Sequence, residues 1–478
     1  MTEHALWRLT AVDTVELLRR GEVSPTELVD AAARRIEATE PAINALPTLC
    51  LERARERARA IEQGGTTRGG AWLGGLPIAV KDITPVAGVR TTYGSPIYAD
   101  HVPKRSDVLV ERLEANGAVV VGKSNTPEFA AGASTFNEVF GKTRNPWNTG
   151  KSVAGSSGGS AAALAAGEVW LATGSDLGGS LRTPASFNSV VGLRPSPGRV
   201  PHGPVAQPFA TLSVAGPMAR TVADAALMLD ACCGEHREDP LSLAQPAQSF
   251  LAAAQRERAP RRVAFSPDLN LTPVDRDVVR LCEQAAQRFA DLGVAVEQAA
   301  PDFSGARETF QTLRAAWFAG EHLQHLADHR EQLKPDVIWN IEKGLALTAE
   351  DIGRAERERA ALYRRVVDFF ADYDLLLCPT AIVPPFDVDV RYVDEVEGQR
   401  FDNYVDWIAI TFVITLTSCP ALSLPAGFTR NGLPVGLQLV APPRAEANLL
   451  GAAALLERTL DIRNRVPIDP IGSGAAQS

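Results

Sequence analysis

The sequence predicts an α/β fold: a single large domain in which a mixed, mostly parallel central β-sheet is covered by helices on both faces. Short apolar runs recur from residue 72 onward, as at Leu76–Val80, Ala118–Val121 and Leu375–Leu377. Such runs, bounded by turns and separated by helix-like stretches, are typical of strands buried on both faces. The 478 residues, 45% of them hydrophobic, are enough for a substantial core.

The elements divide the chain into three parts. Residues 1–65 are expected to form an N-terminal helical region packed on the core, because Ser24–Glu27 has an N-cap serine, a proline and a glutamate in the order that starts a helix. The main domain is expected at 66–470. It would hold a core at about 72–220 and a more variable, more charged region at about 235–400, before a tail at 471–478.

Composition argues against several classes of protein. The net charge of −9 offers no basic face for nucleic acid or an anionic membrane. The longest uncharged stretch, Trp407–Thr429, contains two prolines and several hydroxyl residues, which favours a buried helix and strand over a membrane span. The N-terminus has no signal-peptide pattern, and six scattered cysteines form no CxxC pair. We therefore expect a cytoplasmic protein with reduced cysteines.

Two glycine-rich loops that carry serines are the strongest chemical signal. They are Gly155–Ser160 and Gly174–Ser180, and Lys81 closes an apolar run upstream of both. Glycine lets successive backbone N–H groups point inward at an anion, as an oxyanion hole requires. A lysine and two serines in such loops have the parts for attack on a carbonyl without histidine.

Three other pattern matches point to different chemistry. Gly117–Ser124 fits the P-loop pattern, but its middle residues, Ala-Val-Val-Val, favour a strand where a P-loop needs an open loop. Ser157 fits the GxSxG nucleophile pattern of a Ser–His–Asp/Glu esterase, which stays an alternative. His322, His325 and His329 share one helix face at a spacing that could in principle ligate a metal, but a partly exposed helix explains them better.

The two loops resemble the signature of the amidase signature superfamily. The chain has Gly-Ser-Ser-Gly-Gly-Ser at 155–160 and Gly-Ser-Asp-Leu-Gly-Gly-Ser-Leu-Arg-Thr-Pro-Ala at 174–185, and the similarity extends over nearly the whole chain. The resemblance implies a Ser–cis-Ser–Lys triad: Ser180 as nucleophile, Ser156 as the bridging serine with a cis peptide, and Lys81 as base. Ser175 and Arg194 stand where threonine and lysine are common in the family.

The resemblance also implies the rest of the reaction centre. The backbone N–H groups of Leu177, Gly178, Gly179 and Ser180 would bind the oxyanion, and Ala130 would line the substrate site. Lysine is a base only when neutral, so burial or a nearby positive charge must lower the pKa of Lys81.

Two acidic neighbours of this centre have expected roles. Asp82 would oppose the lowered pKa of Lys81 if its carboxylate pointed the same way. Asp176 and Arg182 are expected to form a buried pair that shapes the second loop.

The substrate class follows from the resemblance alone. It implies a small-molecule amide, with broad acyl or aryl amides, aryl carbamates (urethanes) and esters as options, and no metal or organic cofactor. Phe136, Phe209, Trp317 and Trp339 are candidates for an aromatic pocket wall, together with the stretch from 130 to 136. The glutaminase (A) subunit of a tRNA-dependent amidotransferase is the alternative within the family, and a homodimer is an expectation by analogy. The intact triad argues against a binding scaffold with an idle site.

Overall fold

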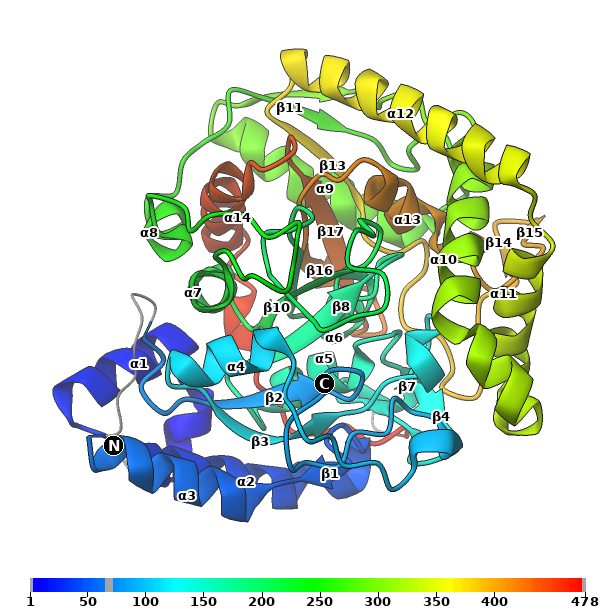
Figure 1. Ribbon diagram of the computed structural model, residues 1–478. Coiled ribbons are helices and arrows are strands. Elements are labelled where there is room, and N and C mark those ends of the chain that lie inside the picture. The colour runs from blue at the N-terminus through cyan, green and yellow to red at the C-terminus, as the bar shows by residue number, and fades with distance from the viewer. Residues whose placement is uncertain (1–2, 65–71, 475–478) are drawn as a thin grey trace.

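The computed structural model describes residues 3–64 and 72–474, and an 11-stranded β-sheet runs through the middle of the molecule (Figure 1). Its strands, in chain order, are β1 (Thr48–Leu49), β2 (Pro77–Lys81), β3 (Val119–Ser124), β8 (Leu171–Asp176), β9 (Val191–Arg194), β10 (Val214–Ala219), β11 (Arg262–Phe265), β12 (Ala295–Gln298), β13 (Leu375–Pro379), β16 (Ala421–Phe428) and β17 (Pro434–Val440). The remaining strands form two-stranded ribbons: β4 (Phe136–Asn137) with β5 (Gly141–Lys142), β6 (Arg144–Asn145) with β7 (Asn148–Ser152), and β14 (Glu395–Val396) with β15 (Gln399–Arg400).

The sheet is mixed, as predicted, but it is not mostly parallel. Its order is β1-β3-β2-β8-β10-β9-β16-β17-β13-β11-β12. Among the described strands, four neighbouring pairs are parallel, β3 with β2, β2 with β8, β13 with β11 and β11 with β12. The other six pairs are antiparallel. One cause is the short 429–433 connection between β16 and β17, because a connection of that length only allows an antiparallel pair.

Helices cover both faces of the sheet, as the alternation of side chains along β2 shows. Ile78 and Val80 belong to a core that includes α7, α9 and α14, whereas Ala79 belongs to a second core that includes α5. The helices are α1 (Ala11–Arg20), α2 (Pro25–Ile43), α3 (Leu51–Glu62), α4 (Val108–Ala115), α5 (Gly158–Ala166), α6 (Arg182–Asn188), α7 (Val222–Cys232), α8 (Phe250–Gln255), α9 (Arg276–Asp291), α10 (Ala306–His329), α11 (Pro335–Leu345), α12 (Ala349–Asp372), α13 (Ala409–Leu416) and α14 (Glu446–Leu460).

The N-terminal helices pack on the β1–β3–β2 end of the sheet. Ser24 caps α2 in the predicted way, since its side chain accepts from the Glu27 backbone N–H while the Glu27 side chain accepts from the Ser24 N–H. Both α2 and α3 contact β3. The predicted boundary between 65 and 66 lies outside the described residues, and the predicted tail at 471–478 is described only as far as 474.

The region at about 235–400 supplies β11, β12 and β13 to the central sheet, and its residues 306–372 form a wall of helices beside it. α10 packs against both α11 and α12, on the right of the molecule in Figure 1. The uncharged stretch at 407–429 divides into α13 and β16, as predicted. No helix among the described residues is long and apolar enough to cross a membrane. All six cysteines are free, as expected for reduced thiols.

Candidate active site

Lys81 is the last residue of β2 and lies completely buried among serine hydroxyls. Its Nζ is 2.6 Å from Ser156 Oγ, 2.9 Å from Ser157 Oγ and 3.0 Å from Ser175 Oγ. Its backbone N–H donates to Thr173 Oγ1 on the neighbouring strand β8 at 3.0 Å, which fixes the end of β2. The sheet therefore holds the lysine at the point where the two serine loops meet.

Burial lowers the pKa of Lys81 to about 7, although the charge of Asp176 acts in the opposite direction. Asp82 does not oppose this shift, because its carboxylate turns to Lys123, with 3.1 Å between Lys123 Nζ and Asp82 Oδ1. A neutral amine is therefore available at Lys81 near neutral pH.

The first serine loop joins β7 to α5 and brings Ser156 to Lys81. The Gly155–Ser156 peptide bond is cis. Gly159 sits in the first turn of α5, where an added Cβ would lie 2.3 Å from the backbone nitrogen of Asn125. Only glycine allows this close approach, so the glycine of the motif sets how deeply α5 packs.

The second serine loop joins β8 to α6 and is organised by the buried Asp176 carboxylate. Arg182 donates to it through Nε at 2.9 Å and Nη2 at 2.8 Å, and Arg194 Nη1 lies 3.3 Å away. Burial alone would raise the pKa of Asp176, but the two guanidinium groups hold it well below the usual range. The predicted pair of Asp176 and Arg182 is confirmed, and Arg194 extends it.

The backbone donors of this loop differ from the prediction at one position. The Gly179 N–H points to Asp176 Oδ1 at 2.9 Å, so it is not free for an oxyanion. Leu177 and Gly178 keep N–H groups with no acceptor among the described residues, and Thr411 Oγ1 holds their loop by donating to Gly178 O at 2.7 Å. Gly179 instead allows the loop to pack closely against Thr411, because an added Cβ would lie 2.3 Å from Thr411 Oγ1.

A cavity of about 90 Å³ opens above these loops. Ser156, Ser175 and Ser180 line its floor together with Leu177 and Gly178, and Ala130 lies in its wall. The rest of the wall is mainly apolar and aromatic, and it includes Ile83, Phe129, Phe310, Trp317, Phe318, Tyr404, Val405 and Ile408. The structure therefore brings the predicted serines and Ala130 to one cavity, with Lys81 buried behind Ser156.

The four aromatic candidates for the pocket wall have different positions. Trp317 lines the cavity as predicted. Phe209 is 74% exposed and does not line it. Trp339 supports the wall from behind, with its ring centroid 5.8 Å from that of Tyr404.

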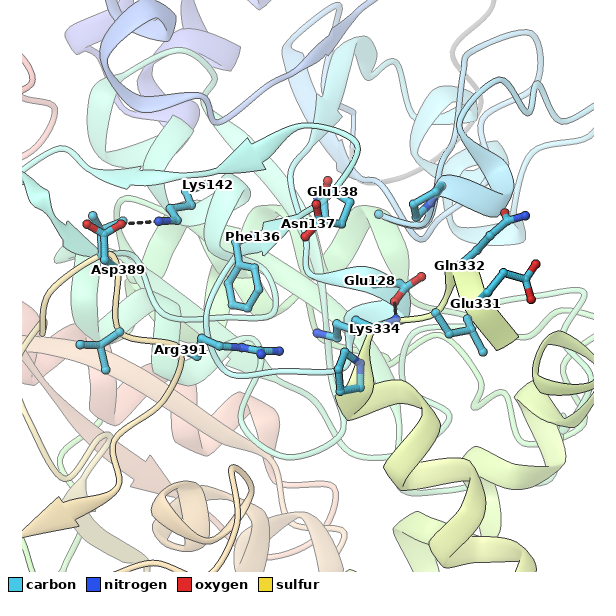
Figure 2. A pocket seen from close by; sticks show the side chains of 16 residues that line it. Glu128, Phe136, Asn137, Glu138, Lys142, Glu331, Gln332, Lys334, Asp389 and Arg391 are labelled. Atoms are coloured by element: carbon cyan, nitrogen blue, oxygen red, sulfur yellow. Dashed lines mark hydrogen bonds and ion pairs between the residues drawn. The ribbon is translucent and has the colours of Figure 1, made fainter. Parts of the chain in front are cut away.

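Phe136 lines a neighbouring pocket of about 500 Å³ (Figure 2). Figure 2 shows its ring among the side chains of Lys142, Lys334 and Arg391. The charged groups of Lys334 and Arg391 each lie 5.5 Å from the centroid of the Phe136 ring. The prediction for Phe136 was wrong, because residues 130–136 turn away from the serine loops after Ala133, which is the last of them to line the cavity.

The other pattern matches have structural explanations. Val119–Ser124 of the P-loop match is the buried strand β3, as its residues predicted. Ser157 is fully buried, does not line the cavity and contacts no histidine among the described residues. The arrangement needed for the esterase alternative is therefore missing.

The histidines of α10 join an aromatic cluster beside the cavity. His325 Nε2 is 2.7 Å from Tyr98 OH, and the ring of Phe129 lies 4.6 Å from that of His322. Burial lowers the pKa of His322 to about 3. Within 3–64 and 72–474, no group of three or more His, Cys, Asp or Glu side chains is arranged to hold a metal ion.

Sequence reasoning missed several residues of the site. Ser175 stands out in the sequence only as a departure from the family pattern, yet its hydroxyl contacts Lys81. Phe310 and Arg314 precede Trp317 on one face of α10, and the spacing of four and then three residues was a readable signal. Tyr404 follows a loop, where no periodicity marks it.

Residues 27–450 match the amidase family. The chain belongs to the amidase signature family. It is 35% identical, over 98% of its length and 99% of the relative, to an acylamidase from Rhodococcus erythropolis. It is also 35% identical to a glutamyl-tRNA(Gln) amidotransferase subunit from Moorella thermoacetica, over 97% of this chain and 99% of that protein.

Solved structures of amidase signature proteins have the same fold. A bacterial aryl acylamidase of this family superposes with a TM-score of 0.86 at 28% identity, covering 96% of this chain and 99% of the other. A 6-aminohexanoate cyclic dimer hydrolase with bound substrate gives 0.86 at 29% identity, covering 97% and 99%. The chain is thus an amidase, a hydrolase that acts on amide C–N bonds.

Proposed function

We propose that this amidase cleaves acyl and aryl amides through an acyl-enzyme on Ser180, with Ser156 as proton relay and Lys81 as base. The observation that carries the proposal is the 2.6 Å contact between Lys81 Nζ and Ser156 Oγ, next to a cavity that Ser156 and Ser180 both line. A lysine with a pKa of about 7 meets the requirement that a general base be neutral at working pH.

The proposed reaction has two halves. Ser180 Oγ forms a bond to the substrate carbonyl carbon, while its proton passes to Ser156 Oγ and the proton of Ser156 passes to Lys81 Nζ. The C–N bond then breaks, and the proton returns by the same route to the leaving amine. A water molecule next attacks the acyl-enzyme, gives its proton to the same relay, and releases the carboxylic acid and Ser180.

The oxyanion of each tetrahedral intermediate needs donors that already point at it. We assign this role to the N–H groups of Leu177, Gly178 and Ser180, since these residues line the cavity and their N–H groups have no acceptor among the described residues. Preorganised donors of this kind stabilise the charge that develops in the transition state.

The substrate class rests on the wall of the cavity. Phe129, Phe310, Trp317 and Phe318 offer flat apolar surface for an aryl or extended acyl group. The names of the acylamidase relative and the aryl acylamidase structure support amides of this kind. Aryl carbamates and esters present the same carbonyl to Ser180 and belong to the proposed range.

The test compares wild type with Ser180→Ala and Ser157→Ala on a nitroanilide, a primary amide, an aryl carbamate and an ester. Ser180→Ala should abolish turnover of every compound, whereas Ser157→Ala should retain part of it. Rapid quenching of wild type should give a protein whose mass is increased by the acyl group, on the peptide that contains Ser180. Acylation of Ser157, or full activity of Ser180→Ala, would refute the assignment.

A second candidate is the glutaminase component of a tRNA-dependent amidotransferase, which the 35% identity to a protein of that name favours. This function predicts ammonia release from glutamine that depends on partner subunits. An assay of the purified chain alone, with glutamine and with 4-nitroacetanilide, separates the two candidates. Hydrolysis of the anilide without a partner supports the amidase proposal.

A further inference from the structure

The wall of the active-site cavity contains a buried guanidinium group without an acidic partner. Arg314 lines the cavity, and only 8% of it is exposed. Its Nη1 donates to Asn340 Oδ1, and its Nη2 donates to the Tyr404 hydroxyl oxygen at 2.7 Å. Both acceptors are neutral, and no carboxylate of residues 3–64 or 72–474 forms an ion pair with it. A buried charge is costly unless an opposite charge compensates it.

Several other buried arginines do have such compensation, whereas Arg220 donates only to the backbone carbonyls of Leu9 and Val169. Arg182 and Arg194 share the Asp176 carboxylate, and Arg199 Nη2 lies 3.4 Å from Glu446 Oε2. Arg314 therefore differs from the paired arginines in its surroundings, and from Arg220 in its position at the substrate cavity.

The surroundings of Arg314 are positively charged. Burial lowers the pKa of Lys334 and of Lys343, and the nearby charge of Arg314 adds to both shifts. Two acids of the same region are already engaged. Asp336 Oδ2 lies 2.9 Å from Arg391 Nη2, and Asp406 Oδ1 lies 3.3 Å from Arg307 Nη1. The guanidinium of Arg314 is therefore available to pair with an anionic group of a bound ligand.

Tyr404 adds a second donor at the same place. Its hydroxyl oxygen accepts hydrogen bonds from Arg314 and from Asn340 Nδ2. Because both of these partners donate, the hydroxyl keeps its own proton, which has no acceptor among the described residues. Tyr404 also lines the cavity. A guanidinium beside a free O–H donor matches the lone pairs of a carboxylate.

We propose that Arg314 and Tyr404 form a subsite that binds a carboxylate carried by the amide substrate. The proposal rests on the proposed function and narrows its substrate class to amides with an anionic substituent, held against the aromatic wall. A planar carboxylate suits the flat guanidinium fork and the narrow cavity of about 90 Å³. The carboxylate then becomes the missing counterion of Arg314.

A purely structural role for Arg314 makes a different prediction. Its guanidinium carbon lies 5.5 Å from the Phe318 ring centroid and 5.6 Å from that of Tyr404, and it ties α10 to α11 through Asn340. If these contacts were its only purpose, its loss would lower the turnover of neutral and anionic substrates equally.

The experiment measures kcat/KM for two matched pairs of substrates. N-succinyl-4-nitroanilide and its methyl ester place the carboxylate on the acyl side, and 4-acetamidobenzoate and 4-acetamidobenzamide place it on the amine side. Wild type should prefer the carboxylate in one pair by about tenfold or more, expressed mainly in KM. The pair that shows the preference identifies the side of the scissile bond that faces Arg314.

Variants then assign the preference to the subsite. Arg314→Gln should bring the ratio close to one, Arg314→Lys should keep part of it, and Tyr404→Phe should reduce it by a smaller factor. Arg359→Gln is the matched control, since Arg359 also donates only to neutral oxygens, Leu416 O and Thr211 Oγ1, but does not line the cavity. Arg359→Gln should keep the wild-type ratio.

Two results would overturn the proposal while leaving the proposed function intact: equal kcat/KM for both members of each pair in wild type, or an unchanged ratio in Arg314→Gln. If no substrate turns over, the proposed function is in doubt but the subsite is still tested by calorimetry. Wild type should bind 4-acetamidobenzoate more tightly than 4-acetamidobenzamide, and Arg314→Gln should not. Equal binding of the two compounds to wild type would also overturn it.

Discussion

Two completely buried lysines lie on neighbouring parallel strands, one beside a carboxylate and the other among neutral hydroxyl groups. Lys81 on β2 is paired in register with Ser124, one residue beyond Lys123 on β3. Lys123 contacts a carboxylate, Asp82, at 3.1 Å, and donates to Thr84 O and Thr91 Oγ1. The amine of Lys81 contacts serine hydroxyls. The same residue type at the same depth is thus an ion-pair partner in one strand and a candidate base in the next.

The difference lies in where Asp82 points. Burial lowers the pKa of both lysines, and the contact with Asp82 counteracts the shift only at Lys123. Asp82 lies in the turn after β2, where its carboxylate contacts Lys123 and accepts from the N–H and the hydroxyl of Thr92. The direction of the Asp82 carboxylate therefore separates the two roles.

The largest expected effect comes from removing the amine of Lys81. Lys81→Ala should fold and lose about 10²- to 10⁴-fold in kcat/KM, the usual contribution of a general base. Kinetics with 4-nitroacetanilide and thermal unfolding of the same sample check this. Hydrolysis at a near wild-type rate would show that Lys81 is not the general base.

Removing the amine of Lys123 should damage stability instead. Lys123→Met leaves Asp82 buried without its cation, which should lower the free energy of unfolding by about 3–5 kcal/mol. Chemical denaturation measures the loss. The double variant Asp82→Asn/Lys123→Met should recover part of it, because no charge is then left unpaired. A stable Lys123→Met protein would contradict the distinction between the two lysines.

The pH dependence of the reaction should follow Lys81. Since only the neutral amine accepts a proton and its pKa is about 7, kcat/KM should reach a plateau above pH 7 and fall about tenfold for each unit below it. A profile measured from pH 5 to 9 tests this, with thermal unfolding at each pH as the control for stability. A plateau extending below pH 6, or activity that appears only near pH 10, would disagree.

The smallest expected effect is at Ser175. Its hydroxyl accepts from Lys81 at 3.0 Å, and an acceptor stabilises the ammonium more than the neutral amine. Ser175→Ala should therefore move the pH profile to lower pH, by less than about one unit. Ser213→Ala is a comparison variant, because Ser213 lines the same cavity and has no contact with Lys81. A shift of the profile to higher pH in Ser175→Ala would contradict the claim that the Ser175 hydroxyl stabilises the ammonium form of Lys81.

Local patterns predicted several buried strands, and they marked the residues that the structure brings together at the candidate site. The glycine spacing around Ser156 and Ser180 and the apolar run before Lys81 were visible in the sequence, and the structure brings both serines to one cavity with Lys81 behind Ser156. The direction of the strands was not predictable in the same way. Apolar runs show that a strand is buried, but they do not show that β9 pairs with β16, which lies far from it in the chain.

The substrate wall was predicted least well. Aromatic residues at Phe136, Phe209 and Trp339 carry no signal that tells a cavity from a surface or a neighbouring pocket. Arg314 was overlooked because arginine on an amphipathic helix is usually solvated. Its spacing from Phe310 and Trp317 indicates a shared helix face, and the fold shows that this face turns to the serines.

The wall of helices has a consequence for how such enzymes diversify. In the proposed mechanism, bond cleavage depends on β2, β8 and the two loops, whereas much of the cavity wall is formed by α10 and the chain around Tyr404, which lie more than a hundred residues later. Exchanging residues on one helix face can therefore retune which compounds are accepted without disturbing the proton path. Under this proposal, the residues that break the bond and the residues that select the substrate belong to different parts of the same polypeptide.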